Sequence, residues 1–411
     1  MAQGKKVIII GAGPAGSIAA ALVQQQGHQA IILEKETFPR FSIGESLLPQ
    51  CMEFIEQAGM LPALQAAGFQ LKTGAAFLYH GQYSEFCFSD QFSTGFTYTY
   101  QVQRARFDAL LASEAQRQGV DIRWQQRVLA ADFSAAKPVL TVIDEQSQET
   151  YRLEADFVLD ASGFGRVLPR LLELETPSGF PVRQAIFTHL EDRISDSTYK
   201  REKIWIVVHP ENAEVWYWLI PFSNGRCSLG VVGETAFFEQ IGNDWQAVLH
   251  TLIAQEPRLS RLLANASFDT PVNTITGYSA NVSSLVGNGY ALLGNAGEFL
   301  DPVFSSGVTI AMKSASLAAD VLNRQFQGHA VDWQRDYAMP LKKGVDTFRV
   351  YVTAWYNSTL QDVLFHPQQQ PNIKAMICSI LAGYVWDEAN PYVKQSQARL
   401  NTLVELCRSP A

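Results

Sequence analysis

The chain of 411 residues is poor in cysteine and shows no sequence pattern of a metal site. Its five cysteines are scattered, odd in number, and form no CxxC pair with a neighbouring histidine cluster. Such spacing is untypical of disulfide frameworks and of zinc sites. We therefore expect buried free thiols and no bound metal.

Charged residues and long apolar runs are also scarce. Only 18% of the residues are charged, and the formal net charge of −8 gives no electrostatic reason to bind nucleic acid or anionic lipid. No run approaches the ~18 apolar residues of a membrane span, and the first six residues do not resemble a signal peptide. We therefore expect a cytoplasmic protein without an integral membrane span, divided by its length into two or three subdomains.

The N-terminus predicts a strand, a tight turn and a helix. A β-branched run at residues 6–10 leads into Gly11, Gly13 and Gly16, and an Ala-rich stretch at 17–26 follows. The first glycine suits a tight turn, the second allows the backbone to approach a pyrophosphate, and the third lets the helix lie close to the strand. This pattern is typical of a dinucleotide-binding unit.

A second strand strengthens that interpretation. Residues 29–33 form another apolar run, which ends at Glu34. An acidic residue about 20 positions after the glycine turn is suited to bind ribose hydroxyls. We therefore predict a nucleotide-binding α/β domain with a Rossmann-like sheet.

The pattern changes several times along the rest of the chain. Further strands are predicted at 75–79, 93–102, 120–124, 139–143, 151–153, 157–160, 185–190, 204–208, 215–220, 227–232 and 290–293, and helices at 106–118, 244–263 and 307–326. The last part is mostly helical, with breaks expected at Pro340, Pro367, Pro371 and Pro391.

These segments predict three regions. A discontinuous nucleotide-binding domain takes residues 1–75, 100–183 and 277–332, and a β-rich substrate domain takes 76–99 and 184–276. Alternating residues in the strands within 184–232 favour an antiparallel sheet with one face covered. Residues 333–411 form a helical C-terminal region.

Two more predicted strands end in turns with glycine. One ends at Asp160 before Gly163, and the other leads into Gly294 and Asn295 before a helix. With the N-terminal turn, these elements resemble the two-domain FAD-binding fold of the flavoprotein monooxygenase superfamily. That superfamily carries an aspartate at the position of Asn295, and asparagine keeps an acceptor oxygen while adding a donor.

The resemblance implies FAD as the cofactor. Arg104 matches a position where the family uses an arginine to hold FAD, although an arginine at the surface of a helix N-terminus is an equal alternative. The predicted cofactor-binding residues are Gly11, Gly13, Ala15, Gly16, Glu34, Lys35, Arg40, Ser42, Ile43, Arg104, Val128, Asp160, Gly163, Asn295, Asp301, Gly307 and Val308.

Within the superfamily, the chain is similar to the flavin-dependent halogenases. Residues 216–221 match the WxWxIP signature of that family, and Lys72 lies at the position of its catalytic lysine. The blocks at 38–49 and 301–308 also resemble the family. The resemblance implies that reduced FAD and oxygen oxidise chloride or bromide to hypohalous acid, which the ammonium group of Lys72 guides to the substrate.

Large side chains are expected to line the path of that oxidant. Trp216 and Trp218 lie two positions apart, hence on one face of a strand. They would keep a substrate away from the flavin, although aromatic residues on a strand often belong simply to the core. The tunnel residues implied by the resemblance are Trp216, Trp218, Ile220, Pro221 and Phe304.

Four further residues receive roles. Backbone amides at Ser306 and Gly307, at the start of a helix, suit a halide ion. Glu45 and Ser46 are predicted catalytic residues that line the cofactor or a proton path, or alternatively cap a helix that begins near Leu47.

One departure narrows the substrate. Tryptophan halogenases carry a glutamate where this chain has Phe304, so a phenol or pyrrole, free or bound to a carrier protein, is the expected substrate. Glu298 is one open candidate for another base. Because no second GxGxxG motif for a nicotinamide cofactor is visible, a separate flavin reductase is expected to supply reduced FAD.

Two alternatives stay open. A flavin hydroxylase or a geranylgeranyl-reductase-like dehydrogenase would keep the FAD elements but would have no use for Lys72 and the tryptophan pair. A halogenase-like protein that binds FAD without halogenating would keep all of them.

Overall fold

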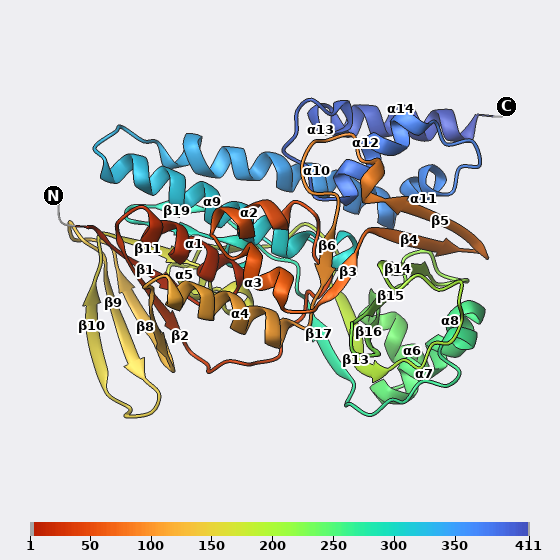
Figure 1. The fold of residues 1–411 in the computed structure, drawn as a ribbon, viewed down its shortest axis with the longest axis horizontal. Coiled ribbons are helices and arrows are strands. Elements are labelled where there is room, and N and C mark those ends of the chain that lie inside the picture. Colours follow the sequence, from red (N-terminus) through yellow and green to blue (C-terminus); the bar gives the residue numbers. More distant parts are fainter. Residues whose placement is uncertain (1–3, 410–411) are drawn as a thin grey trace.

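A six-stranded sheet organises the nucleotide-binding half of the computed structural model, which describes residues 4–409 (Figure 1). Its strand order is β19-β20-β11-β1-β2-β7, and all neighbours are parallel except β19 and β20. The strands are β1 Lys6–Ile10, β2 Gln29–Glu34, β7 Asp121–Trp124, β11 Phe157–Asp160, β19 Val286–Gly287 and β20 Tyr290–Leu292. Since β1, β11 and β20 are adjacent, the three glycine turns predicted from the sequence meet at one edge of this sheet.

Helices pack against this sheet and against each other. The long helix α9 contacts α1, which also contacts α2 and α4. The helices are α1 Pro14–Gln25, α2 Cys51–Gln57, α3 Leu61–Ala66, α4 Arg104–Arg117, α5 Val167–Leu171 and α9 Ser306–Phe326. A β-carbon on Gly16 would stand 1.9 Å from the Gly11 carbonyl oxygen, so only glycine allows α1 to approach β1 this closely.

A three-stranded antiparallel meander extends from the nucleotide-binding half (Figure 1). It consists of β8 Gln126–Asp132, β9 Val139–Asp144 and β10 Thr150–Glu154. A short pair of strands, β12 Glu175–Thr176 and β18 Asn281–Val282, lies elsewhere in this half.

A seven-stranded sheet of order β17-β13-β16-β15-β14-β4-β5 forms the second half. Its strands are β4 Gly74–Tyr79, β5 Gln82–Cys87, β13 Arg183–Glu191, β14 Lys203–Val208, β15 Trp216–Pro221, β16 Arg226–Glu234 and β17 Asn273–Thr276. The antiparallel pairing expected for the strands within 184–232 is confirmed, and β4, from outside that segment, joins β14 in parallel. The expectation that only one face is covered was wrong, because both faces of β15 are buried. Residues from 76–99 and 184–276 contribute to this sheet, and the domain boundaries themselves stay a prediction.

The two faces of β15 have different surroundings. Trp216, Trp218 and Ile220 belong to the core shared with the nucleotide-binding half, whereas Tyr217 belongs to a second core. That second core lies under α6 Thr235–Ile241, α7 Trp245–Gln255 and α8 Pro257–Leu262. The predicted single helix at 244–263 is divided before Pro257, because proline lacks the amide needed to continue the hydrogen-bond ladder.

A small ladder connects the two halves. It pairs β3 Gln70–Lys72 with β6 Thr99–Gln101. The strand expected at 93–102 is therefore limited to its last part, and Lys72 lies opposite Thr99.

The C-terminal region is helical, as expected, and docks onto the rest of the protein. A π-helical turn at Gln334–Ala338 leads into α10 Met339–Tyr356, followed by α11 Thr359–Leu364, α12 Pro371–Leu381, α13 Pro391–Lys394 and α14 Ser396–Arg408. Pro340 does not break the chain of helical turns, since it lies in the first turn of α10, where its missing amide needs no partner. The Trp333 ring stacks on Phe157 at 4.5 Å, and the Tyr337 hydroxyl donates to the Leu292 carbonyl.

All five cysteines are free thiols. Cys51, Cys227 and Cys378 are buried, whereas Cys87 and Cys407 are partly exposed, so the expected burial holds for three of them. No helix within residues 4–409 is both long and apolar enough to cross a bilayer.

Candidate active site

A cavity of about 510 Å³ reaches from the glycine turn after β1 to the aromatic face of β15. Most of the site residues predicted from the sequence line it. They are Gly11, Gly13, Ala15, Glu34, Lys35, Arg40, Ser42, Ile43, Glu45, Ser46, Arg104, Val128, Gly163, Trp216, Trp218, Ile220, Asn295, Gly307 and Val308. The predicted residues that do not line it are Gly16, Lys72, Asp160, Pro221, Asp301, Phe304 and Ser306.

The first end of the cavity has the shape of a nucleotide cradle. A β-carbon at Gly13 would meet no atom other than Arg40 within 4 Å, so the backbone there is open to a ligand. Gly13 precedes α1 as its N-cap without a side-chain cap, which leaves the first amides of that helix free to bind phosphate.

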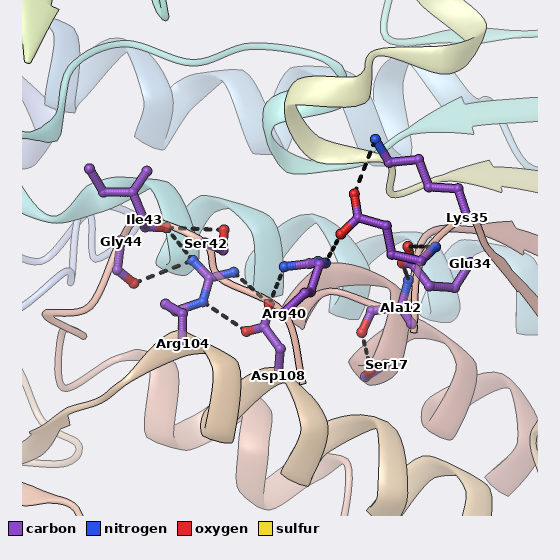
Figure 2. Close-up of polar contacts among 11 residues, drawn as sticks. Ala12, Ser17, Glu34, Lys35, Arg40, Ser42, Ile43, Gly44, Arg104 and Asp108 are labelled. Carbon is purple, nitrogen blue, oxygen red and sulfur yellow. Dashed lines mark hydrogen bonds and ion pairs between the residues drawn. The ribbon is translucent and has the colours of Figure 1, made fainter. Parts of the chain in front are cut away.

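Glu34 fixes the turn and faces the same cavity. Its Oε2 accepts from the Ala12 amide at 2.8 Å and its Oε1 accepts from the Glu36 amide at 3.0 Å (Figure 2). Each carboxylate oxygen retains a lone pair after these bonds. Glu34 can therefore hold ribose hydroxyls while it anchors the glycine turn.

Arg104 supports the loop that forms the opposite wall. Its Nε and Nη2 donate to the two oxygens of Asp108 at 2.7 and 2.9 Å, and its Nη1 donates to the Ile43 carbonyl at 2.6 Å (Figure 2). Arg40 binds the same carboxylate at 3.2 Å. Arg104 is buried, so the alternative of a surface arginine is wrong. The sequence reasoning missed Asp108, although its spacing of four from Arg104 in a helix was a usable signal.

Asp160 and Gly16 serve the backbone of the fold. Asp160 is fully buried, and it accepts from the amides of Ser162 at 2.9 Å and Leu168 at 2.6 Å. Burial raises the pKa of this carboxyl. Neither residue lines the cavity, so a direct contact of Asp160 with the cofactor stays a prediction, whereas Gly16 has the packing role expected of the third glycine.

Trp216 and Trp218 form the aromatic wall of the cavity, and hydrogen bonds hold both side chains in place. Trp216 Nε1 donates to the Tyr356 hydroxyl at 3.0 Å, and that hydroxyl donates to Asp301 Oδ2 at 2.8 Å. Trp218 Nε1 donates to Ser228 Oγ at 3.0 Å. Both indoles are thus fixed in orientation by bonds behind the wall. Tyr356 comes from α10 and was not identified from the sequence.

Asp301 acts through this chain of bonds and does not line the cavity. Its Oδ1 accepts from the Val303 amide at 3.0 Å, and the Arg183 guanidinium lies 3.5 Å from the centre of the Tyr356 ring. Burial raises the pKa of Asp301 to about 6. Its predicted direct contact with the cofactor is therefore replaced by a role in positioning the wall.

The start of α9 closes one side of the cavity. Gly307 and Val308 line it, whereas Ser306 and Phe304 are buried behind it, with the Phe304 ring 6.2 Å from Trp355. The helix has no side-chain cap at Ser305, so its first amides lack intrahelical partners. Halide binding at this terminus stays a prediction.

Lys72 is buried immediately behind the cavity wall, with 1% of its surface exposed. Its Nζ donates to the Leu47 carbonyl at 2.7 Å, and burial lowers its pKa to about 7. Leu47, which accepts this bond, directly follows Ser46 of the cavity wall. Burial excludes a solvated surface lysine. A tunnel lined jointly by Lys72 and the tryptophans is not seen, because only the tryptophans line the cavity.

The remaining predicted groups have unexpected partners. Glu45 and Ser46 do not cap a helix, because α2 begins only at Cys51, with Gln50 as its N-cap. Glu45 Oε1 instead contacts Nε2 of His189, a residue of β13 that the sequence did not reveal, at 2.6 Å. Glu298 is bound to Arg349 and does not line the cavity, which removes it as a free base.

Comparisons with known proteins agree with this architecture. The family model described as FAD binding domain matches residues 5–338. The chain is 28% identical over 397 residues to a 1H-pyrrole-2-carbonyl-[peptidyl-carrier protein] brominase from Pseudoalteromonas luteoviolacea, covering 93% of this chain and 92% of that protein. It is 29% identical over 356 residues to a tryptophan 2-halogenase from Chondromyces crocatus, covering 80% of this chain but only 66% of that relative.

A solved structure matches the fold closely. The flavoprotein/dehydrogenase from Cytophaga hutchinsonii superposes with a TM-score of 0.94 at 44% identity, and the match covers 98% of this chain and 99% of that one. The open glycine cradle, the anchored acid at the end of β2 and the neighbouring strand ends fit FAD. The chain belongs to the FAD binding domain family and is an FAD-dependent oxidoreductase related to the flavin-dependent halogenases.

Proposed function

We propose that this protein halogenates an electron-rich aromatic substrate, a phenol or a pyrrole, with chloride or bromide. The observation that carries the proposal is a lysine with a lowered pKa directly behind a cavity that fits FAD and is walled by Trp216 and Trp218. Bound reduced FAD would donate two electrons to oxygen. The activated oxygen would then take two electrons from the halide.

Different cavity residues would bind different parts of the cofactor. The Gly13 turn and the N-terminus of α1 would bind the pyrophosphate, and Glu34 the ribose. The loop braced by Arg104 would lie along the flavin, with the start of α9 on the other side. Asn295, which lines the cavity, would contact the ribityl chain through its amide group.

Lys72 would receive the hypohalous acid. With a pKa of about 7, a large fraction of this side chain is a neutral amine near neutral pH, which can hydrogen-bond the oxidant or react with it to give a haloamine. Lys72 is buried behind the wall, and its Nζ donates to the carbonyl of Leu47, which follows the wall residue Ser46. Halogenation through Lys72 would therefore require the oxidant to leave the cavity past the Leu47 segment.

The substrate class is inferred from Phe304, which is buried behind the cavity wall. Phe304 stands where a tryptophan halogenase would supply a carboxylate, so the substrate itself must be activated, as a phenolate or a pyrrole is. The similarity to a brominase named for a carrier-bound pyrrole supports a substrate tethered to a carrier protein as one form. A separate flavin reductase would deliver the reduced cofactor.

The direct test combines the purified protein with FAD, a flavin reductase, NADH, oxygen, and chloride or bromide. A panel of phenols and pyrroles, free or carrier-bound, is then examined by mass spectrometry. We expect a halogenated product that requires halide and is lost in Lys72→Met, while FAD binding is retained. Lys203→Met is the matched control, because Lys203 is also buried but contacts Cys87 Sγ at 3.0 Å, away from the cavity.

Halide-independent hydroxylation, or equal loss of product in both lysine variants, would contradict the proposal. The similarity to a flavoprotein named as a dehydrogenase favours a second candidate, a flavin-dependent dehydrogenase. The same assay without oxygen separates the two. A dehydrogenase would reduce or oxidise a substrate anaerobically and would not depend on Lys72.

A further inference from the structure

Glu45 and His189 form a pair that spans the cavity wall. Glu45 lines the cavity and is 3% exposed, and its Oε1 lies 2.6 Å from His189 Nε2. Its other oxygen, Oε2, has no hydrogen-bond partner within residues 4–409 and is not among their fully enclosed polar atoms. The side chain of His189 is 20% exposed, and its Nδ1 is likewise unpaired and not enclosed. Glu45 therefore faces the cavity, and the imidazole bonded to it is partly exposed.

Aromatic rings hold the histidine in this position. Phe41 and Phe222 pack against the imidazole with ring centres at 5.7 and 5.3 Å. The nearest ionisable groups are the Arg104 guanidinium, which donates to the adjacent Gly44 carbonyl at 3.4 Å, and the Cys227 thiol of β16. Within residues 4–409 neither group hydrogen-bonds to the carboxyl or the imidazole, so a proton exchanged within the pair has no third acceptor bonded to it.

The proposed halogenation consumes a proton. With ArH as the aromatic substrate and X⁻ as the halide, the balance is ArH + X⁻ + O₂ + FADH₂ + H⁺ giving ArX + FAD + two H₂O. The reduced flavin gives up two electrons. The conversion of ArH and X⁻ into ArX and H⁺ gives up two more, and oxygen accepts all four. Counted from FADH₂, one proton must therefore be delivered to the cavity in every turnover, and two when the bound flavin is the anion FADH⁻.

We propose that Glu45 and His189 carry this proton, an assignment that rests on the proposed function. The imidazole takes up a proton from water at Nδ1 and releases its Nε2 proton to Glu45 Oε1. The carboxyl group then presents the proton to the cavity, where oxygen is reduced. Histidine suits this role because small changes in its surroundings move its protonation through the neutral range.

The variants that test the relay are His189→Ala, His189→Gln and Glu45→Gln. We expect turnover to fall by about 100-fold in each, as is typical when a positioned proton donor is lost, with unchanged FAD affinity. The loss should be larger at pH 8 than at pH 6, where protons are more abundant. Added imidazole should restore His189→Ala but not Glu45→Gln. His250→Ala, on the exposed side of α7, is the matched control and should show neither loss nor rescue.

Two readouts do not depend on halogenated product. In the FAD-free protein, the unfolding midpoints of Glu45→Gln, His189→Ala and the double variant should be non-additive, because the two side chains contact each other. In the FAD-loaded protein without substrate, oxidation of anionic reduced flavin to peroxide takes up one proton, from FADH⁻ + O₂ + H⁺ to FAD + H₂O₂. A pH-indicator dye should record slower uptake in the variants.

The outcomes separate the relay from the function on which it rests. If the wild-type protein gives no halogenated product but the dye shows slowed uptake in the variants, halogenation fails and the proton path stands. If His189→Gln matches the wild type in turnover and in proton uptake, or if imidazole fails to rescue His189→Ala, the relay is wrong.

Discussion

Two buried ionisable side chains give the site its sensitivity to pH. Lys72 and Asp301 each lie behind the cavity wall, and burial favours the neutral form of both. The lysine pKa falls and the carboxyl pKa rises, so both approach the neutral range from opposite sides. Both side chains belong to the layer behind the cavity lining, where burial controls their charge.

Lys72→Met should stabilise the fold increasingly as the pH is lowered from about 10 to about 7. The unfolded chain protonates Lys72 near its ordinary pKa of 10.5, whereas the folded protein does so only near 7. Over this window the folded state binds fewer protons, so the wild type loses stability relative to the variant, by up to about 5 kcal/mol. The advantage should be constant below pH 7. Urea unfolding of the FAD-free proteins measures it, and pH-independent differences would contradict the assignment.

Asp301→Asn should show the opposite pH window. The unfolded chain releases the Asp301 proton near pH 4, while the folded protein retains it up to about pH 6. Wild-type stability therefore falls as the pH rises between these values, and above pH 6 the variant should be more stable by up to about 3 kcal/mol. At pH 4 the two proteins should unfold alike. Chemical unfolding at pH 4 and pH 7 provides the comparison, and an equal difference at both would exclude the raised pKa.

At the scale of single elements, two glycines near the turn between β1 and α1 are expected to have different roles. Gly16 allows close packing, and Gly13 leaves room for the cofactor. Gly16→Ala should destabilise the protein by several kcal/mol, since its β-carbon would clash with the Gly11 carbonyl. Gly13→Ala should leave the unfolding midpoint nearly unchanged, because its β-carbon has room, yet should weaken FAD binding by filling the cradle. Thermal unfolding and flavin fluorescence titration distinguish the two. Equal effects of both variants on stability would be inconsistent with this division.

Local patterns predicted the elements that surround the site. The alternation in 216–221 placed Trp216 and Trp218 on one face and Tyr217 on the other, because strand side chains alternate. The glycine turns could also be predicted from the sequence, since each follows an apolar strand. The parallel pairing of β14 with β4 was not predictable in this way, because it joins segments more than 100 residues apart.

The same reason explains which site residues were missed. His189 meets Glu45 across 144 positions, and Tyr356 meets Trp216 across 140. Neither contact produces a periodic pattern within a short stretch of sequence. Lys72 was selected by resemblance alone, and only the fold shows that it lies behind the wall rather than in it. Asp160 and Gly16 belong to the motifs of the cofactor turns but lie one layer behind the cavity lining.

At the scale of the whole molecule, the helical C-terminal region is part of the structural core. A protein ending at residue 332 should not reach a stable fold, because it loses the Trp333 stack on Phe157 and the Tyr337 bond to β20. Removal of α14 alone, by ending the chain at Gln395, should cost less, since α14 mainly packs on α11, α13 and α10. Limited proteolysis and circular dichroism compare the two. A folded, FAD-binding 1–332 fragment would contradict this view.

The bond from Tyr356 to Trp216 and Asp301 also has a consequence for the order of synthesis. The glycine cradle, the braced loop and both tryptophans leave the ribosome before α10 does, so a nascent chain holds the parts that bind FAD while its wall still lacks Tyr356. Because a chain without α10 is not expected to reach a stable fold, FAD binding is expected only after the wall has been fastened by Tyr356. Because Tyr356 comes late in the chain, the wall formed by Trp216 and Trp218 becomes rigid only once the protein is nearly complete.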